Sequence, residues 1–329
     1  MKKLCAVGEA LIDFIPEKQG FALKDVMRFK RVAGGAPANV AAAVAKLGGD
    51  SRFVTQLGED AFGEHIMEVF KKCKIDTDYI ARSKEYDTAL AFVSLKEDGN
   101  RDFMFYRRNS ADMMLQPNQL AEGVLDDVQI LHYCSVSLVN CPMKDTHRWM
   151  IKRMQDLGRW ISFDPNVRLS LWNDALACQQ TIREFLPFAH IIKISDEELS
   201  FISGMEKIED ALDFFFEGSC ELLIYTMGKD GARCYRKDRS FIEVSGFKVD
   251  VFDTTGAGDS FIGAFLFRLL HDGIVNLNSI SDGQLKDMLM FSNAYAALTT
   301  TKEGAIDAMA DIQQVSAFLQ ENKSEYDEN

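Results

Sequence analysis

The chain has 329 residues, of which 47% are hydrophobic, so it can bury a large core and is long enough for two domains or one large α/β domain. The net charge of -13, with 37 Lys and Arg against 50 Asp and Glu, and the lack of a basic block argue against nucleic acid as a partner. Seven cysteines without a Cys-x-x-Cys pair are typical of reduced thiols, and the first apolar run stops at Glu9, too short for a signal segment or a membrane span. We therefore expect a cytoplasmic protein with no membrane partner.

Short apolar runs rich in Val, Ile and Phe alternate along the chain with longer segments of helical period. In chain order the strand-like runs cover residues 4–8, 51–58, 128–136, 160–166, 190–195 and 221–228, and the helical segments include 38–49, 60–73, 145–158 and 196–204. Such alternation is typical of a parallel sheet covered by helices on both faces. The sequence therefore predicts the α/β class, with residues 1–329 forming one domain around a doubly wound, mostly parallel sheet. In such sheets, ligands bind beyond the carboxyl ends of the strands.

One region breaks the alternation. Residues 88–107 contain two strand-like runs joined at Asp98-Gly99, a turn signal, with no helix between them. Together with residues 21–35, which also lack helical period, this hairpin is expected to form a small β flap over the strand ends. We refer to this flap as the lid and expect it to comprise approximately residues 14–33 and 86–110.

The lid carries aromatic residues that would be exposed on a small sheet. Phe92, Phe103 and Phe105 are expected to supply one apolar face. An uncovered sheet of this size would be prone to aggregate, so a second copy of the chain is expected to cover it. The sequence therefore predicts a homodimer that forms through the lid.

A glycine-rich loop follows in the C-terminal part of the chain. Residues 247–251 alternate between apolar and polar as a strand does, and apolar residues from Phe261 onward recur at helical spacing, so the loop between them should be a strand-to-helix turn. Gly256 and Gly258 would let backbone N–H groups approach a bound anion such as phosphate. Asp259 could cap the helix, or it could take a proton from a hydroxyl that attacks the phosphate. The two glycines favour the second role, because an ordinary cap needs neither.

The same loop belongs to a set of motifs that resemble a known family. DTTGAGDSF, residues 253–261, resembles the C-terminal signature of the ribokinase-like (PfkB) family of sugar and nucleoside kinases. GGAPANVAAAVAKLGG, LGEDAFG and TMGKDG match other motifs of that family, and GEALIDF, FYRRNSADMML, DPNVRLSLW and KISDEEL resemble its fructokinase branch. The resemblance extends from Gly8 to about Gly304. It implies a ribokinase-like fold and a kinase that uses ATP and Mg²⁺.

The resemblance also implies roles for the residues of the glycine-rich loop. Asp259 would be the catalytic base, and Gly256, Ala257 and Gly258 would form the anion hole for the transferring phosphoryl group. The chain contains no G-x-x-x-x-G-K-[ST] motif, so its phosphate site must differ from a P-loop.

The sugar site would lie near the N-terminus. Asp13 resembles the aspartate that accepts hydrogen bonds from substrate hydroxyls in relatives, although a surface turn acid would look the same. Gly34, Gly35 and Asn39 match sugar-contacting positions, and the glycines could equally serve as a helix entry before Pro37.

Two arginines are candidates for finer recognition of the substrate. Arg107 would hang over the pocket if the lid closes, unless it is a solvated hairpin charge, and Arg108 beside it is a rival. Arg168 follows a strand of the main sheet. Either side chain could donate two hydrogen bonds to phosphate or sugar oxygens.

The resemblance also assigns residues to the nucleotide. Thr226, Gly228 and Gly231 would line the ATP phosphates and ribose together with Gly258, and Asn293 matches a residue near the adenine. On its own, a glycine turn after a strand is more often only a turn.

Metal sites follow from the resemblance as well. Glu198 would organise Mg²⁺, through water, and Ser195 stands where relatives carry asparagine in the same motif. Asp253, Thr255 and the loop that ends at Gly304 fall at the positions of a monovalent cation site, so K⁺ is a further candidate cofactor.

The leading hypothesis is an ATP-dependent phosphorylation of a small sugar, D-fructose first, to fructose 6-phosphate. A 2-keto-3-deoxygluconate kinase is the closest alternative, followed by a ribokinase and an aminoimidazole riboside kinase. A nicotinamide dehydrogenase would need a G-x-G-x-x-G motif after the first strand, which is absent. A non-catalytic sugar sensor of the same fold is the alternative from another class, and it would be expected to lack Asp259.

Overall fold

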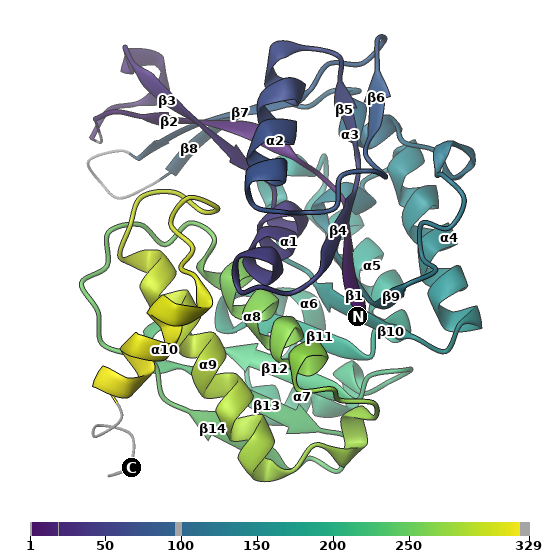
Figure 1. The fold of residues 1–329 in the computed structure, drawn as a ribbon, viewed down its shortest axis with the longest axis vertical. Coiled ribbons are helices and arrows are strands. Elements are labelled where there is room, and N and C mark those ends of the chain that lie inside the picture. The colour runs from purple at the N-terminus through teal and green to yellow at the C-terminus, as the bar shows by residue number, and fades with distance from the viewer. Residues whose placement is uncertain (1, 19, 96–100, 323–329) are drawn as a thin grey trace.

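The computed structural model describes residues 2–18, 20–95 and 101–322. In this part of the chain eight strands form the main sheet, in the order β14-β13-β12-β11-β10-β9-β1-β4 (Figure 1). Their bounds are β1 Lys3–Val7, β4 Ser51–Val54, β9 Val128–Cys134, β10 Trp160–Asp164, β11 Ile191–Ser195, β12 Leu222–Thr226, β13 Ala232–Arg236 and β14 Phe241–Val244. The strands from β12 to β4 run parallel, and β13 runs antiparallel to both of its neighbours, β12 and β14. The predicted fold class is therefore confirmed.

Helices cover both faces of this sheet, as Figure 1 shows. The helices are α1 Ala36–Lys46, α2 Ala61–Lys72, α3 Ala111–Met114, α4 Pro142–Asp156, α5 Ala175–Phe185, α6 Asp196–Ser203, α7 Ile208–Phe215, α8 Ala257–His271, α9 Asp282–Thr300 and α10 Ile312–Glu321. The central strand β1 shows how the two layers arise. Leu4 and Ala6 pack into the core beneath α1, α8 and α9, whereas Cys5 and Val7 pack into the core beneath α4 to α7. A strand whose successive side chains all face apolar cores reads as a continuous hydrophobic run.

A second, four-stranded sheet projects from one end of the molecule and forms the lid (Figure 1). Its strands, in spatial order, are β3 Phe29–Gly34, β2 Leu11–Pro16, β7 Ala89–Leu95 and β8 Arg101–Tyr106. The predicted turn at Asp98-Gly99 lies outside the described residues. A small two-stranded sheet of β5 Gln56–Gly58 and β6 Ala81–Ser83 connects the lid region to α2.

The aromatic residues of the lid do not share one face, which corrects the sequence expectation. In the β7–β8 register Phe92 pairs with Met104, whereas Phe105 pairs with Ala91, so Phe92 and Phe105 point to opposite sides of the sheet. Phe92 stacks on Phe14 with the ring centroids 4.6 Å apart. The side chain of Phe103 lies outside what the structure describes. Period-2 alternation is reliable within one strand, but the hairpin register that combines two strands cannot be read from it.

The predicted strand at residues 247–251 is also wrong. The segment is irregular, and the amides of Phe252 and Asp253 bond to the carbonyl of Thr300 at the end of α9 instead of to a neighbouring strand. Val251 and Phe252 are exposed rather than inserted into a core. The glycine-rich loop is therefore anchored by α9, and α8 begins after a loop instead of directly after a strand.

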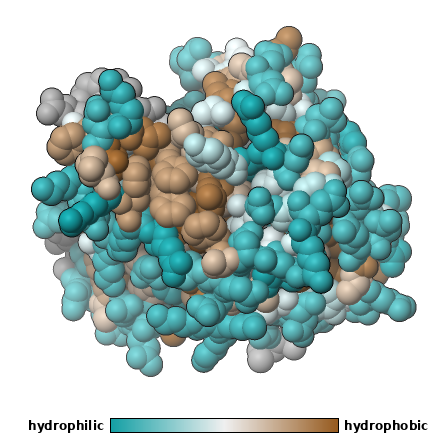
Figure 2. Space-filling model, turned by 90° about the horizontal axis from the view of Figure 1, so that it is seen from above, coloured by the Kyte–Doolittle hydropathy of each residue, from teal (hydrophilic) through white to brown (hydrophobic). Residues whose placement is uncertain are grey.

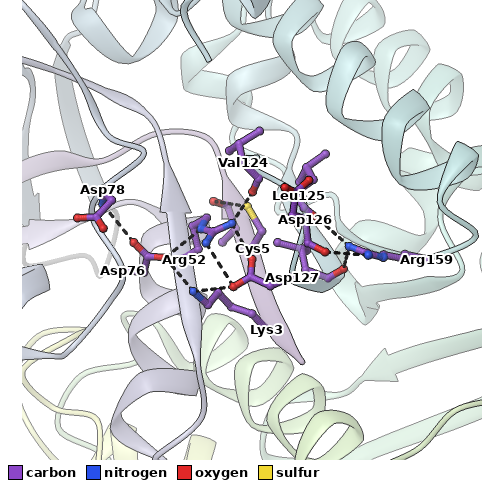
Figure 3. A network of polar contacts seen from close by, with 12 residues as sticks. Lys3, Cys5, Arg52, Asp76, Asp78, Val124, Leu125, Asp126, Asp127 and Arg159 are labelled. Carbon is purple, nitrogen blue, oxygen red and sulfur yellow. Dashed lines mark hydrogen bonds and ion pairs between the residues drawn. The ribbon is translucent and has the colours of Figure 1, made fainter. Parts of the chain in front are cut away.

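A polar cluster lies at the amino ends of β1 and β4, opposite the carboxyl ends of the strands where ligands are expected to bind (Figure 3). Arg52, at the start of β4, is buried and pairs with Asp76 at 3.0 Å and Asp127 at 2.9 Å, and its guanidinium also donates to the carbonyl of Val124. Lys3 joins the same two carboxylates. Burial opposes the charge of Asp76, but the hydrogen bonds from Lys3 and Arg52 outweigh it and lower the pKa of Asp76.

None of the described helices is long and apolar enough to cross a bilayer.

Candidate active site

Asp259 lies in the first turn of α8 and is held by two amides from other elements. Its carboxylate accepts a hydrogen bond from Asn39 Nδ2 of α1 at 2.8 Å and another from Asn166 Nδ2 at 3.4 Å. Asn166 follows β10 and has a φ of 44°, a left-handed conformation that asparagine tolerates better than most residues. Asn166 itself is only 8% exposed. Three segments far apart in sequence therefore position one carboxylate.

The start of α8 is shaped so that its backbone is open to a ligand. Gly256 is the cap residue of α8 and has a φ of 76°, and a Cβ atom there would lie 2.8 Å from Cβ of Ala305. Only glycine fits this position without displacing the loop after α9. Ala257 and Gly258 continue the first turn, where backbone N–H groups lack partners within the helix, and the amide of Ala257 donates to the carbonyl of Thr254 at 3.2 Å in the preceding loop. The geometry therefore suits a bound anion.

Lys193, which the sequence interpretation did not single out, lies against this helix start. A Cβ atom placed on Gly258 would lie 3.0 Å from Lys193 Nζ, and Lys193 also pairs with Asp164 at 3.0 Å. Lys193 is buried in β11 and Asp164 ends β10. A charged residue within the apolar run HIIKIS was the available signal, because lysine is almost never fully buried unless it is paired.

The charges in this buried cluster shift one another. Burial raises the pKa of Asp259, while the hydrogen bond from Asn39 and the charges of Lys193 and Arg168 oppose the rise. Burial likewise raises the pKa of Asp164, to about 6. For Lys193 burial disfavours the charge, but the carboxylate of Asp164 and the other nearby acids outweigh it and raise the pKa. A carboxylate with a raised pKa is a stronger base than an ordinary aspartate, which suits proton abstraction.

Asp13 faces the same end of the sheet from the lid strand β2. Its carboxylate lies directly over Gly34, where a Cβ atom would collide with it. No hydrogen bond from the described residues reaches this carboxylate, and burial raises its pKa to about 7. Asp13 remains partly exposed, so a donor such as a sugar hydroxyl could reach this carboxylate and stabilise its charged form. Gly35 has a φ of 115° and packs against the backbone of Glu9, which brings α1 and Asn39 close to the lid.

Arg107 is not placed over the pocket as the sequence suggested. Its guanidinium is buried and pairs with Asp112 at 2.7 Å, and it donates to Ser137 Oγ at 3.2 Å. Ser137 donates to Glu9, which in turn accepts from the amide of Ala36 at the start of α1. Arg107 therefore connects the end of β8 to α1 through a buried network, whereas its neighbour in sequence, Arg108, is exposed.

Arg168 remains on the surface near the base. Its side chain is exposed and donates to the carbonyl of Val167, and its charge is one of the influences that keep the pKa of Asp259 from rising further. It is therefore free to reach an anionic group brought to the start of α8.

The residues predicted to contact the nucleotide lie at the ends of two adjacent strands. Ser195 of β11 and Thr226 of β12 are register partners, and the turn with Gly228 and Gly231 follows Thr226 directly. Asn293 of α9 is placed differently: its Nδ2 donates to the carbonyls of Val244 and Ser245. This amide anchors the segment after β14.

Glu198 organises the loop between β10 and β11. Its carboxylate accepts from the amide of Val167 at 2.7 Å and from both the amide and the hydroxyl of Ser195 at 2.9 Å. A carboxylate has about four acceptor positions, so roughly one is left after these three bonds. This set fits a magnesium ion held through water better than one bound directly.

The residues predicted to hold a monovalent cation converge. Asp253 accepts from the amide and the hydroxyl of Thr255 at 2.9 and 2.6 Å through one oxygen, and from the amide of Gly304 at 3.0 Å through the other. Asp253 thereby joins the glycine-rich loop to the loop after α9. The carboxylate charge of Asp253 at this junction is compatible with a nearby cation.

Similar proteins show which family the chain belongs to. The model of the pfkB family carbohydrate kinases matches residues 1–312. Probable fructokinase-4 from Arabidopsis thaliana is 40% identical over 97% of both chains. The crystal structure of fructokinase with bound ATP from Xylella fastidiosa superimposes with a TM-score of 0.90 at 31% identity, covering 98% of this chain and 99% of that one. A fructokinase double mutant from Vibrio cholerae O395, in a form with fructose, ADP and potassium ion bound, gives a TM-score of 0.86 at 32% identity, covering 97% of this chain and 98% of that one.

Proposed function

Because the chain belongs to the pfkB family of carbohydrate kinases, we propose that it transfers the γ-phosphoryl group of ATP to fructose, giving fructose 6-phosphate and ADP. One observation carries this proposal: Asp259 is buried at the glycine-rich start of α8, and the carboxylate of Asp13, which accepts no hydrogen bond from the described residues, lies at the same end of the sheet. A base beside an anion site is the arrangement that phosphoryl transfer to a hydroxyl needs.

In this proposal the hydroxyls of the sugar donate to Asp13, and Gly34, Gly35 and Asn39 form the floor beneath it. Asp259 takes the proton of the primary hydroxyl while that oxygen attacks the γ-phosphorus and the bond to ADP breaks. The N–H groups of Gly256, Ala257 and Gly258 stabilise the transferring group.

Two cations of the chain complete this arrangement. Lys193 Nζ, held beside Gly258 by Asp164, is aimed at the same place as the helix start and would neutralise charge there. Arg168 approaches from the surface and could donate to a phosphate or to the sugar. Because the transition state is loose, positioning and charge neutralisation supply most of the rate acceleration.

The nucleotide would extend from α8 across the ends of β11 and β12, over Thr226, Gly228 and Gly231. Glu198 would hold a magnesium ion through water, and such an ion would supply neutralisation of the phosphate charge. Asp253, Thr255 and Gly304 would hold a monovalent cation such as K⁺ beside the anion hole. Asn293 would act on the nucleotide site through the backbone of Val244 and Ser245.

The lid surface supports a homodimer. Exposed apolar side chains gather on the lid, and Figure 2 shows a hydrophobic patch on this side of the molecule. The exposed lid side chains are Phe21, Met27, Met104 and Tyr106. We propose that a second copy covers them, and a single monomeric species in sedimentation at micromolar concentration would contradict this.

All seven cysteines lie within the described ranges and carry free thiols, which fits a reducing cytoplasm.

The experiment that tests the function is ADP release by the purified chain with Mg²⁺ and ATP. Fructose, 2-keto-3-deoxygluconate, ribose, adenosine and no sugar are compared, with Asp259→Asn and the exposed control Asp250→Asn alongside. Turnover on fructose should fall by roughly 100-fold to 10,000-fold in Asp259→Asn and stay near wild type in the control. A folded Asp259→Asn variant with undiminished turnover would refute the proposed base, and preference for another sugar would refute fructose as the substrate.

A further inference from the structure

A cavity of about 600 Å³ lies behind the lid, away from Asp259. It is bounded by β3, the C-terminal end of α1, one side of α2 and the loop after α9. Its charged and titratable lining residues are Arg31, Lys46, His65, Glu68, Lys72, Lys74 and Asp307, with Cys73 beside them. A cavity of this volume is within the range that holds small-molecule ligands.

The charge of this cavity opposes that of the protein. Four of its side chains are cationic and two are anionic, which is a local excess of positive charge in a chain whose net charge is -13. None of Arg31, Lys72 and Lys74 forms an ion pair with a residue that the structure describes. Lys46 is half-buried, and its Nζ donates to the carbonyls of Ile306 and Met309 at 2.5 and 3.0 Å. Cations converging on a concave surface form a site for an anion.

The environment of His65 agrees with an excess of positive charge. Burial, and then the charge of Arg31, lower the pKa of His65. His65 is therefore neutral near pH 7 and can donate or accept a hydrogen bond without adding to the charge of the site.

Three walls of the cavity are also parts of the active site. Strand β3 contributes Arg31 to the cavity and ends at Gly34, beneath Asp13. Helix α1 contributes Lys46 at its end, and carries Asn39, the partner of Asp259, at its start.

The loop after α9 connects the two sites most directly. Ile306 and Asp307 line the cavity, and the preceding Ala305 packs against Gly256. Figure 1 shows this loop, in yellow, running close to the lid, and Lys30 of β3 pairs with Glu303 at 2.9 Å. A change in how β3, α1 and this loop are held together therefore changes both the sugar end and the phosphate end of the active site.

We propose that this cavity is an effector site for a small phosphorylated metabolite, whose binding raises the activity of the neighbouring active site. The phosphate would lie between Arg31 of the lid, Lys72 at the end of α2, and Lys74, which follows α2. Without bound phosphate, these like charges repel β3 from α2. Bound phosphate draws β3 and α2 together. The effect on activity rests on the proposed function, whereas the binding site itself does not.

Inorganic phosphate is the probe for a first test. Calorimetric titrations would use the full chain without sugar or nucleotide, and again saturated with fructose and a non-hydrolysable ATP analogue whose γ-phosphate occupies the start of α8, so that an ion there is distinguished from one in the cavity. The test variant is Arg31→Gln with Lys72→Gln. The matched control is Arg28→Gln with Lys71→Gln, two exposed cations outside the cavity lining, one directly before β3 and one in α2.

We expect the dissociation constant for phosphate to rise at least about tenfold in the test variant and to change less than about twofold in the control, because two charge-assisted hydrogen bonds are lost only in the former. Phosphate should also raise kcat/KM for fructose in the wild type and the control but not in the test variant. Equal binding by wild type and test variant would overturn the site. Binding that is lost in the test variant while phosphate leaves the wild-type rate unchanged would overturn the coupling. The calorimetric result stands even if fructose proves not to be the substrate.

Discussion

Replacing Lys193 separates its proposed role in catalysis from its role in stability. Its Nζ lies 3.0 Å from Asp164, and the two side chains are 7% and 0% exposed. Removing one partner of a buried pair leaves an uncompensated charge and costs about 3–5 kcal/mol of unfolding free energy. Lys193→Met alone should therefore be destabilised by about this amount, whether or not the lysine touches the phosphoryl group.

A second substitution removes that ambiguity. Asp164→Asn deletes the other charge and keeps an oxygen that can accept from the amide of Asn166, which Asp164 now does at 3.2 Å. Replacing both members of a buried pair is often nearly neutral, so the double variant should regain most of the lost stability. If Lys193 neutralises charge on the transferring group, the turnover of the double variant should still be lower by about 100-fold to 1,000-fold.

Urea unfolding and steady-state kcat on the two single variants and the double variant provide the assay. The reasoning would be refuted by a double variant that is as stable as wild type and retains kcat within about threefold, because Lys193 would then matter only for folding. The pH dependence adds a check. The folded pKa of Asp164, about 6, lies above its ordinary value of 3.8, so the native state binds more protons between these values. Loss of Lys193 should raise that pKa further, so the deficit of Lys193→Met relative to wild type should shrink as the pH falls toward 6 and stay constant below about 6.

Three further outcomes are expected. Burial raises the pKa of Asp13 to about 7, and a sugar hydroxyl that donates to the carboxylate favours its charged form, so the KM for fructose should rise as the pH falls below about 7; a flat profile would contradict this. Arg52→Ala should lose about 2–4 kcal/mol of unfolding free energy in urea, with partial exposure of its partners reducing the effect. Because the folded pKa of Asp76 is lowered, its share of this loss should be present above pH 3.8 and vanish as the pH falls through the folded value. Gly256→Ala should lower kcat while costing about 1–2 kcal/mol for the left-handed φ, and an unchanged kcat would mean that the contact with Ala305 does not position the anion hole.

Local motifs predicted the parts of the site that depend on the chain near them. The first turn of α8 requires glycine at 256 for its φ of 76°, and that requirement is visible in nine consecutive letters of sequence. The order of strands and helices could also be predicted from the sequence, because β1 and its neighbours are buried on both faces and their apolar runs are continuous. Fold class and the place of Asp259 follow from such local rules.

Contacts between distant segments could not be predicted from the sequence in the same way. Asn293 looked like a ligand of the nucleotide, yet its amide bonds to the carbonyls of Val244 and Ser245, 49 and 48 residues away. Residues 247–251 have the alternation of a strand but no neighbouring strand to pair with, because the amides that follow bond to α9. A pattern records which side chains are apolar and does not record which backbone groups satisfy one another.

Arg107 and Lys193 show that the placement of charged residues is equally hard to predict from the sequence. A sequence places Arg107 at the tip of a strand and Lys193 within one, which suggests an exposed recognition residue and an ordinary strand position. The fold reverses this assignment, because Asp112 draws Arg107 into a buried pair and Asp164 stabilises Lys193 beside the start of α8. A buried cation is tolerated only where an acid compensates it, so the informative feature is the pair. For this chain, searching buried strands for a charge and then for an acid at the end of an adjacent strand would have found Lys193.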